Sequence, residues 1–245
     1  MPLLRSPLAG LDCVVLAGGL GTRLRPVIGE HQKVAVTIGG EAFISRLLRW
    51  LCDRGARRVV LAVGYQSSDV VKAVASHAHD LELVLSEEPQ PLGTAGALCL
   101  ACDHVVGRHF VALNGDSFFS ADLGALRALH ERTEAAVTLA LARVADCSRF
   151  GIVSQAPDGH IRAFREKDPT RHGRAIVNAG VYLMERDIFA DLPRNQPTSL
   201  ERDVLPPLCE AGRVFGLATD GELVDIGTPE SFMTAEDALI SGGLR

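Results

Sequence analysis

The chain has 245 residues, of which 47% are hydrophobic and 5% aromatic, and its formal net charge is −5. This length is sufficient for one large α/β domain or two small ones, and aliphatic side chains can fill a sizeable core. An acidic balance without a long basic run argues against a general nucleic-acid or membrane-surface role. The sequence has no signal-type N-terminal segment and no apolar stretch near ~20 residues, which predicts a soluble cytoplasmic protein.

The first half of the chain alternates short apolar runs with amphipathic segments. Hydrophobic periodicity predicts four strands, at residues 13–16, 58–63, 81–85 and 110–113. The intervening segments are predicted to be helices, at 41–54, after a cap at Ser67 or Ser68, and after Gly96. The apolar residues on one face of the first helix are Phe43, Ile44, Leu47, Leu48 and Leu51. Those expected to point inward from the second helix are Val70, Val71 and Val74.

This alternation favours a Rossmann-like α/β fold, in which a mostly parallel sheet carries helices on both faces. Ligands of such sheets bind outside the carboxyl ends of the strands. Three segments follow predicted strands and should meet at that edge: the glycine-rich loop 18–21, the loop 91–96 and Asp116.

In the second half of the chain, predicted strands outnumber predicted helices and no longer alternate with them. A helix is predicted over 123–130, and strands over 136–142, 176–184, 214–218 and 222–225. Residues 151–153 and 161–164 read as a hairpin whose turn is Asp158-Gly159. Helices should begin at caps Ser199 and Thr228, with Pro206 and Pro207 ending or kinking the first of them. No linker divides the sequence, which predicts one domain, with residues 1–120 binding a nucleotide and 121–245 supplying a small β lid and pocket walls.

The loop after the first strand has the strongest functional pattern. Gly18, Gly19 and Gly21 permit close approach of a ligand to the backbone, and consecutive backbone N–H groups can bind an anion. Thr22 and Arg23 add a hydroxyl and a guanidinium suited to phosphate, as does Arg25. The alternative is a plain strand-to-helix turn. The loop matches neither a Walker motif nor the dinucleotide fingerprint, whose third glycine would stand where Leu24 is.

Four further groups can carry chemistry, and each has a structural alternative. Lys33 can neutralise phosphate or lie solvated on the surface. Asp116 and Asp225 follow predicted strands and can hold Mg²⁺ or merely form turns. Glu166-Lys167 can bind a sugar phosphate or protect a strand edge. Asn178-Ala-Gly180 can bind sugar hydroxyls or form a bulge.

The six cysteines lie mostly within apolar runs, where a reduced thiol packs as a small hydrophobic group. Cys99 and Cys102 have CxxC spacing, but no second CxxC and no nearby pair of histidines accompanies them. Core packing is therefore favoured over zinc or redox chemistry for these two thiols.

The set of motifs resembles the sugar-1-phosphate nucleotidyltransferases. The matching segments run from residues 16–26 through 91–96, 114–116, 166–167 and 178–180 to 225–229. The resemblance implies a GT-A-like nucleotidyltransferase fold. Residues 114–119 with Asp122-Leu123 are most similar to the branch that transfers a guanylyl group to D-glycero-D-manno-heptose 1-phosphate.

The resemblance implies a reaction in which a nucleoside triphosphate, GTP by preference, and a sugar 1-phosphate give a nucleotide sugar and pyrophosphate, with Mg²⁺ as cofactor. It implies catalytic roles for Arg23, Lys33 and Asp116, and metal binding by Asp116 and Asp225. The residues implied to hold the nucleotide are Leu16, Ala17, Gly18, Gly19, Gly21, Thr22, Glu88, Gly93 and Thr94. Those implied to hold the sugar phosphate are Asn114, Glu166, Lys167, Asn178 and Gly180. A homo-oligomer is left open, and neither nucleic acid nor a membrane is expected as a partner.

One segment departs from the family pattern. The lysine of the family usually stands in Pro-Lys-Pro, whereas here the segment is Gln32-Lys33-Val34. Proline fixes φ and restricts the residue before it, so its loss predicts a more mobile segment or a shifted lysine. This departure motivates a rival hypothesis, a weakly catalytic nucleotide-sugar-binding subunit. Two further alternatives are an enzyme for mannose 1-phosphate or another hexose phosphate, and a glycosyltransferase, although the Asp-X-Asp motif of the latter is missing around Asp116.

Overall fold

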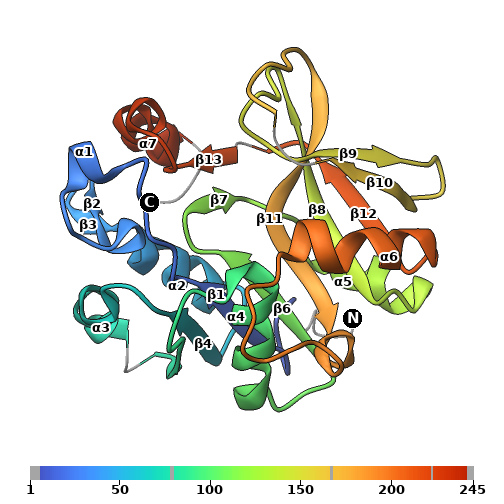
Figure 1. The fold of residues 1–245 in the computed structure, drawn as a ribbon, viewed down its shortest axis with the longest axis horizontal. Coiled ribbons are helices and arrows are strands. Elements are labelled where there is room, and N and C mark those ends of the chain that lie inside the picture. Colours follow the sequence, from blue (N-terminus) through green and yellow to red (C-terminus); the bar gives the residue numbers. More distant parts are fainter. Residues whose placement is uncertain (1–5, 78–79, 166–167, 222, 242–245) are drawn as a thin grey trace.

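The computed structural model describes residues 6–77, 80–165, 168–221 and 223–241 (Figure 1). The strands are β1 (Asp12–Leu16), β2 (Thr37–Ile38), β3 (Glu41–Ala42), β4 (Arg58–Val63), β5 (Glu82–Glu87), β6 (His109–Asn114), β7 (Ser117–Phe119), β8 (Val137–Val144), β9 (Ile152–Gln155), β10 (Ile161–Arg165), β11 (Ala175–Glu185), β12 (Val214–Thr219) and β13 (Leu223–Asp225). The α-helices are α1 (Arg25–Ile28), α2 (Phe43–Asp53), α3 (Ser67–Val74), α4 (Gly93–Ala101), α5 (Leu123–Thr133), α6 (Leu205–Glu210) and α7 (Pro229–Ser241).

A nine-stranded sheet runs through the molecule in the order β10-β9-β11-β6-β1-β4-β5, with β8 paired to β11 and β12 paired to β8. The strands of the first half, β5, β4, β1 and β6, are all parallel, as predicted. In the second half the sheet is mixed, because β11 runs antiparallel to both β6 and β8. The predicted hairpin forms as β9 and β10, and one pairing of β9 with β11 attaches it to the main sheet.

The sheet is apolar on both faces because its central strands are uniformly hydrophobic. In β1, Cys13 and Val15 belong to one core cluster, whereas Val14 between them belongs to the other. Residues of α2, α3, α5 and α7 contribute to the first cluster, and residues of α4 and α6 to the second. The prediction of helices on both faces is therefore confirmed. The C-terminal helix α7 lies beside the N-terminal elements, as Figure 1 shows, with Glu236 close to Gly39.

Three local predictions are corrected by the structure. The helix expected from residue 41 begins at Phe43, because the two residues of β3 pair with β2. Val71 is exposed, whereas Val70 and Val74 are buried. Positions four apart share a helix face, and Val71, which directly follows Val70, lies off that face. Pro206 and Pro207 stand in the first turn of α6, where proline is tolerated, after a π-helical turn at Leu200–Val204 capped by Ser199.

His130, near the end of α5, is buried and hydrogen-bonds through Nδ1 to Thr138 Oγ1 at 2.8 Å. Its ring packs edge-on against His109. Burial, and then the neighbouring charge of His109, lower the pKa of His130 from its ordinary 6.5 to about 4, while Glu185 and Glu131 oppose the shift. The fold therefore holds this imidazole neutral.

We expect the free energy of unfolding to fall as the pH falls from about 6.5 to about 4, because the unfolded chain binds a proton that the folded chain excludes. The full loss is on the order of 3 kcal/mol, since a tenfold difference in proton affinity is worth about 1.4 kcal/mol. Urea unfolding across this range should show it, and His130→Gln should flatten the dependence. The matched control is His172→Gln at an exposed site, and an equal slope in the two variants would contradict the prediction.

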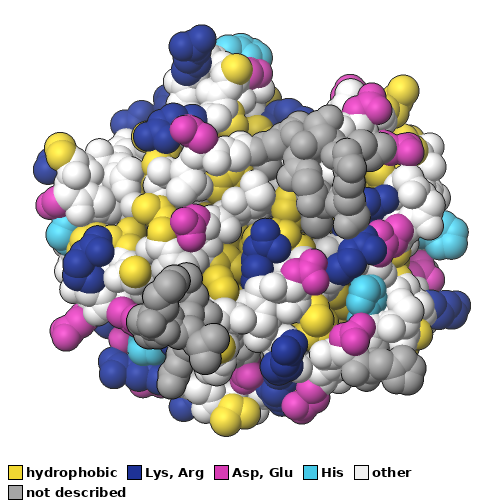
Figure 2. Space-filling view, turned by 180° about the vertical axis from the view of Figure 1, so that it is seen from behind, with side chains coloured by type: hydrophobic (Ala, Val, Ile, Leu, Met, Phe, Trp, Pro, Cys, Tyr) yellow, Lys and Arg dark blue, Asp and Glu magenta, His cyan; other side chains and the backbone are white. Residues whose placement is uncertain are grey.

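No helix among the described residues is long and apolar enough to cross a membrane. On the face seen in Figure 2, side chains of Lys and Arg are interspersed with those of Asp and Glu over the described surface. The described part of this face therefore lacks the single-signed basic patch that a general nucleic-acid role uses.

Candidate active site

The glycine-rich loop leaves β1 at the carboxyl edge of the sheet and leads into α1. Gly21 has φ +58°, a left-handed conformation that favours glycine. A Cβ on Gly18 would stand 2.4 Å from Glu88 Oε1, so this position packs tightly against the loop that follows β5. Gly19 is exposed and has open space around it. The loop thus exposes its backbone to solvent at Gly19. Gly18 is required by close packing against Glu88, and Gly21 by its positive φ.

The two arginines of this segment have different surroundings. Arg23 and Thr22 are exposed, and neither makes a hydrogen bond or ion pair with the described part of the chain. Arg25 instead lies over the ring of Tyr65, 5.3 Å from its centroid, and Tyr65 hydrogen-bonds to Glu30. Arg23 is therefore available to an incoming anion, and the suggested phosphate role of Arg25 stays a prediction.

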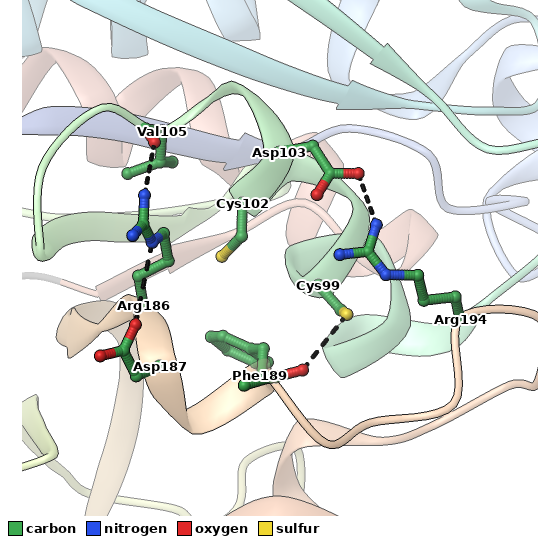
Figure 3. Close-up of a pocket in the computed structure, with 9 residues that line it drawn as sticks. Cys99, Cys102, Asp103, Val105, Arg186, Asp187, Phe189 and Arg194 are labelled. Carbon is green, nitrogen blue, oxygen red and sulfur yellow. Dashed lines mark hydrogen bonds and ion pairs between the residues drawn. The ribbon is translucent and has the colours of Figure 1, made fainter.

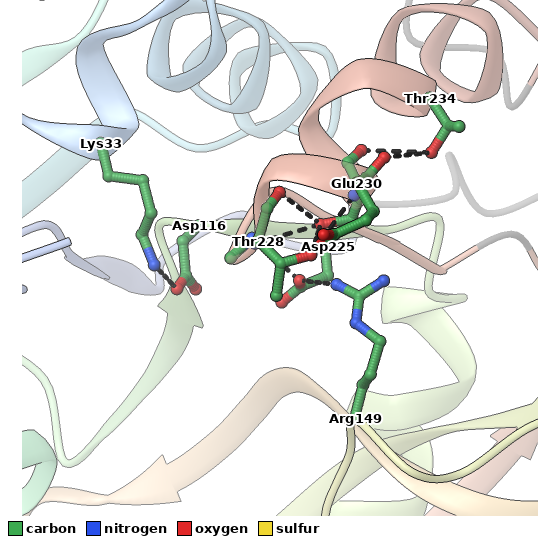
Figure 4. Close-up of polar contacts among 9 residues, drawn as sticks. Lys33, Asp116, Arg149, Asp225, Thr228, Glu230 and Thr234 are labelled. Carbon is green, nitrogen blue, oxygen red and sulfur yellow. Dashed lines mark hydrogen bonds and ion pairs between the residues drawn. The ribbon is translucent and has the colours of Figure 1, made fainter. Parts of the chain in front are cut away.

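Lys33 is brought to the end of β6, where its Nζ pairs with Asp116 Oδ2 (Figure 4). Its side chain is 12% exposed, so it is not the solvated surface lysine of the alternative interpretation. Lys33 also lies next to the glycine loop, because a Cβ on Gly21 would stand 3.4 Å from Lys33 Cβ. The lysine thus connects the glycine loop to the strand-end aspartate.

Asp116 and Asp225 are brought together by the short strands that flank them. In the antiparallel pairing of β7 with β13, Asp225 lies opposite Ser117, and Ile226 N donates to Asp116 O at 3.0 Å. Arg149 pairs with Asp225 Oδ1, which also accepts from Gly227 N at 2.9 Å (Figure 4). Each carboxylate therefore faces a cation contributed by a distant segment.

Glu88 borders the glycine loop from the end of β5. Its Oε2 accepts a hydrogen bond from Leu92 N at 2.7 Å, and burial raises the pKa of its carboxyl. The segment expected as a loop after it forms the first turn of α4, beginning at Gly93. Thr94 uses its hydroxyl within the fold, donating to Glu201 at 3.0 Å and accepting from Leu200 N at 2.8 Å. A nucleotide contact from Thr94 stays a prediction.

The long strand β11 carries Asn178 and Gly180, and Asn114 at the end of β6 lies beside Gly180. Asn178 Nδ2 donates to the hydroxyl of Tyr182 at 2.6 Å, and Gly180 N donates to Asn178 Oδ1 at 3.1 Å. The register of β11 against β8 shifts between Asn178 and Tyr182, so the bulge interpretation of this motif is correct. The two amides nevertheless stand on neighbouring strands near Asp116, because β11 pairs with β6 and Val181 lies opposite Leu113.

We expect Gly180→Ala to destabilise the fold by about 1–3 kcal/mol, since Gly180 has φ +74° and an added Cβ would stand 2.8 Å from Asn114 Nδ2. Gly173→Ala is the matched control, because Gly173 also has positive φ but open space around it. Urea unfolding measures both variants. Equal destabilisation would mean that contact with Asn114 is unimportant.

Glu166 and Lys167 lie outside the described residues. The sequence interpretation did not assign site roles to Arg149, Tyr182 or Gln32. No motif marks Arg149, whereas Tyr182 could have been found from its position four residues after Asn178.

The two cysteines with CxxC spacing lie away from this site. Cys99 and Cys102 line a cavity of about 350 Å³ between α4 and the segment around Phe189 (Figure 3). Burial is the main cause that raises the pKa of both thiols, to about 12 for Cys102. All six cysteines are free. Burial thus favours the protonated thiol at both positions, the form in which a reduced cysteine packs as a small apolar group.

The fold and the site define an α/β protein in which a glycine-rich loop, a lysine and two strand-end carboxylates gather beside the carboxyl edge of the parallel strands. The family model described as nucleotidyl transferase matches residues 12–242. The chain therefore belongs to the nucleotidyl transferase family and is an enzyme of that class, which confirms the resemblance noted from its motifs.

Relatives in this family cover most of the chain. D-glycero-alpha-D-manno-heptose 1-phosphate guanylyltransferase of Aneurinibacillus thermoaerophilus is 30% identical, over 94% of this chain and 98% of its own. Mannose-1-phosphate guanylyltransferase of Mycobacterium tuberculosis is 33% identical, but the chain spans 65% of its length. The crystal structure of HddC from Yersinia pseudotuberculosis complexed with GMP-PN is 31% identical, with a TM-score of 0.80 over 93% of this chain and 98% of that one.

Proposed function

We propose that the enzyme transfers a guanylyl group from GTP to D-glycero-D-manno-heptose 1-phosphate, giving a GDP-sugar and pyrophosphate. The nearly full-length similarity to a heptose 1-phosphate guanylyltransferase supports the sugar. Similarity over 93% of the chain to HddC, whose crystal structure contains GMP-PN, supports the guanine nucleotide. The observation that carries the proposal is the ion pair between Lys33 and Asp116, which lies beside Gly21 of the glycine-rich loop.

In the proposed reaction, an oxygen of the sugar phosphate attacks the α-phosphorus of GTP in line. A new oxygen–phosphorus bond forms while the bond to the bridging oxygen of the β-phosphate breaks, and pyrophosphate leaves. Both substrates are highly charged, so positioning and neutralisation supply most of the catalysis. Lys33 would neutralise charge at the reacting phosphates, and exposed Arg23 would hold the triphosphate and the leaving pyrophosphate.

The strand-end carboxylates fit a magnesium ion. Asp116 and Asp225 offer hard oxygen donors from adjacent backbone segments, and their side chains are 33% and 25% exposed. No group of three or more potential metal-binding side chains is present among the described residues. Two carboxylates suit Mg²⁺, which usually completes its coordination with phosphate oxygens and water. When bound, the ion would withdraw charge from the phosphates.

The amides at the β11 bulge are proposed to read the sugar. Asn114 and Asn178 can donate to and accept from hydroxyl groups, and Gly180 keeps the backbone close to them. Glu166 and Lys167 are proposed to hold a sugar hydroxyl and the sugar phosphate. A homo-oligomer and a cytoplasmic location stay predictions.

Pyrophosphate release with Mg²⁺ tests the proposal, using a matrix of common nucleoside triphosphates and sugar 1-phosphates that includes heptose and mannose. We expect the strongest signal for GTP with heptose 1-phosphate. A stronger signal for mannose 1-phosphate would identify that sugar as the substrate instead. We include it because the Mycobacterium tuberculosis relative is a mannose-1-phosphate guanylyltransferase. Tight nucleotide binding without any release would favour the weakly catalytic subunit.

A further inference from the structure

Gln32 immediately precedes Lys33, and its side chain is buried although it is polar; the residue is 1% exposed. Its carboxamide nitrogen donates to two backbone carbonyls, Gly19 O at 3.1 Å and Tyr65 O at 3.0 Å. Both donor hydrogens of the amide are therefore used, one toward the glycine loop and one toward the segment after β4. This single side chain joins three segments that the sequence separates by 13 and 33 positions.

The backbone of Gln32 is fixed as well. Its N–H donates to Asp69 Oδ2 at 3.1 Å, and the same oxygen lies 3.2 Å from His31 Nδ1. Asp69 stands in the first turn of α3, so the anchor is a helix rather than a loop. A proline at position 32 would lack this N–H and the amide side chain. The segment that the loss of proline predicts to be mobile is thus held by three hydrogen bonds.

We propose that Gln32 and Asp69 are positioning residues, which hold the backbone of Lys33 so that its ammonium group reaches the reacting phosphates. The inference rests on the proposed role of Lys33. Because Gln32 also binds the carbonyl of Gly19, it fixes the distance between the glycine loop and the lysine that acts on the same triphosphate. The lysine side chain has a limited length, so the position at which its backbone is held determines which phosphates the ammonium group can reach.

The test is a double-mutant cycle in steady-state kinetics with the best substrate pair. Gln32→Met keeps an unbranched side chain but removes both donors, and it should lower kcat by about 10–100-fold, the effect expected of a misplacement near 1 Å. The KM for GTP should change far less than kcat. In a Lys33→Met background, Gln32→Met should have almost no further effect, because it acts through Lys33.

A matched control separates positioning from general stability. Gln155 on β9 also donates through its carboxamide to two carbonyls, those of Gly159 in the β9–β10 turn and Gly216 on β12. Gln155→Met should lower stability in urea unfolding without the loss of kcat. Asp69→Ala should lower kcat in the same direction as Gln32→Met, and Asp69→Asn, which keeps an oxygen acceptor, should restore most of it. The Asp69 pair provides the test if Gln32→Met does not fold.

Three outcomes would overturn the inference: an unchanged kcat in both Gln32→Met and Asp69→Ala, an equal loss of kcat in Gln155→Met, or effects of Gln32→Met and Lys33→Met that multiply. Failure of the proposed role of Lys33 looks different, because Lys33→Met alone would then retain the kcat of the wild type. Failure of the proposed reaction differs again, since the wild type would release no pyrophosphate with any substrate pair.

Discussion

Substitution of Asp116 by asparagine is expected to lower kcat/KM by about 10³-fold, because a carboxylate that holds a catalytic cation contributes several kcal/mol to the transition state. The amide keeps the size of the side chain and can still accept a hydrogen bond from Lys33. It cannot supply the negative charge that is proposed to bind Mg²⁺, so the Mg²⁺ concentration for half-maximal activity should rise. Pyrophosphate release across a Mg²⁺ titration measures both effects.

Folding of the Asp116→Asn variant should be nearly intact, since the side chain is partly exposed and lies at a strand end. Thermal unfolding checks this point. Asp191→Asn is a suitable control, because Asp191 is an exposed carboxylate outside the site. Wild-type activity in Asp116→Asn, with an unchanged Mg²⁺ requirement, would remove Asp116 from the metal site.

Lys33→Met is expected to lower kcat by about 10²–10³-fold, the usual cost of removing one preorganised group that stabilises developing charge. Methionine retains most of the aliphatic chain, so packing against Gly21 should persist. The loss should be larger in kcat than in the KM for GTP, because in the proposed reaction the charge of Lys33 acts at the reacting phosphates. Asp116 would lose its partner, which also predicts a changed Mg²⁺ requirement.

The control for this variant is Lys72→Met, which removes an exposed lysine on α3. Steady-state kinetics of the two variants should differ by the full factor given above. A loss confined to the KM for GTP would mean that Lys33 binds the nucleotide in its ground state without favouring the transition state. A loss shared by Lys72→Met would point instead to the general charge of the surface.

The local parts of the fold could be predicted from the sequence because each has a short-range cause. Alternation of apolar runs with helical periodicity predicted the parallel strands β1, β4, β5 and β6 and the helices between them. Gly55 ends the α2 segment with φ +91°, as expected of a glycine after a helix. The ends of the helices were predicted less accurately. The two residues of β3, which were expected to belong to α2, pair with β2 instead.

The edge of the site could also be predicted, because the carboxyl ends of parallel strands meet at one side of a sheet. That rule places the glycine loop after β1 and Asp116 after β6, two neighbouring strands. Asp225 is different, since its strand is not in the main sheet. The pairing of β13 with β7 brings it to Asp116, and this pairing joins segments more than a hundred residues apart.

The sequence by itself determined the glycine loop, the strand-end aspartates and the family, since these depend on residue type and local spacing. The tertiary structure alone decided which cations face which carboxylates. Arg149 meets Asp225 across 76 positions and Lys33 meets Asp116 across 83. It also decided that Gln32 lies buried between two carbonyls. Local patterns carry no record of such contacts, because they arise when distant segments pack around a shared sheet edge.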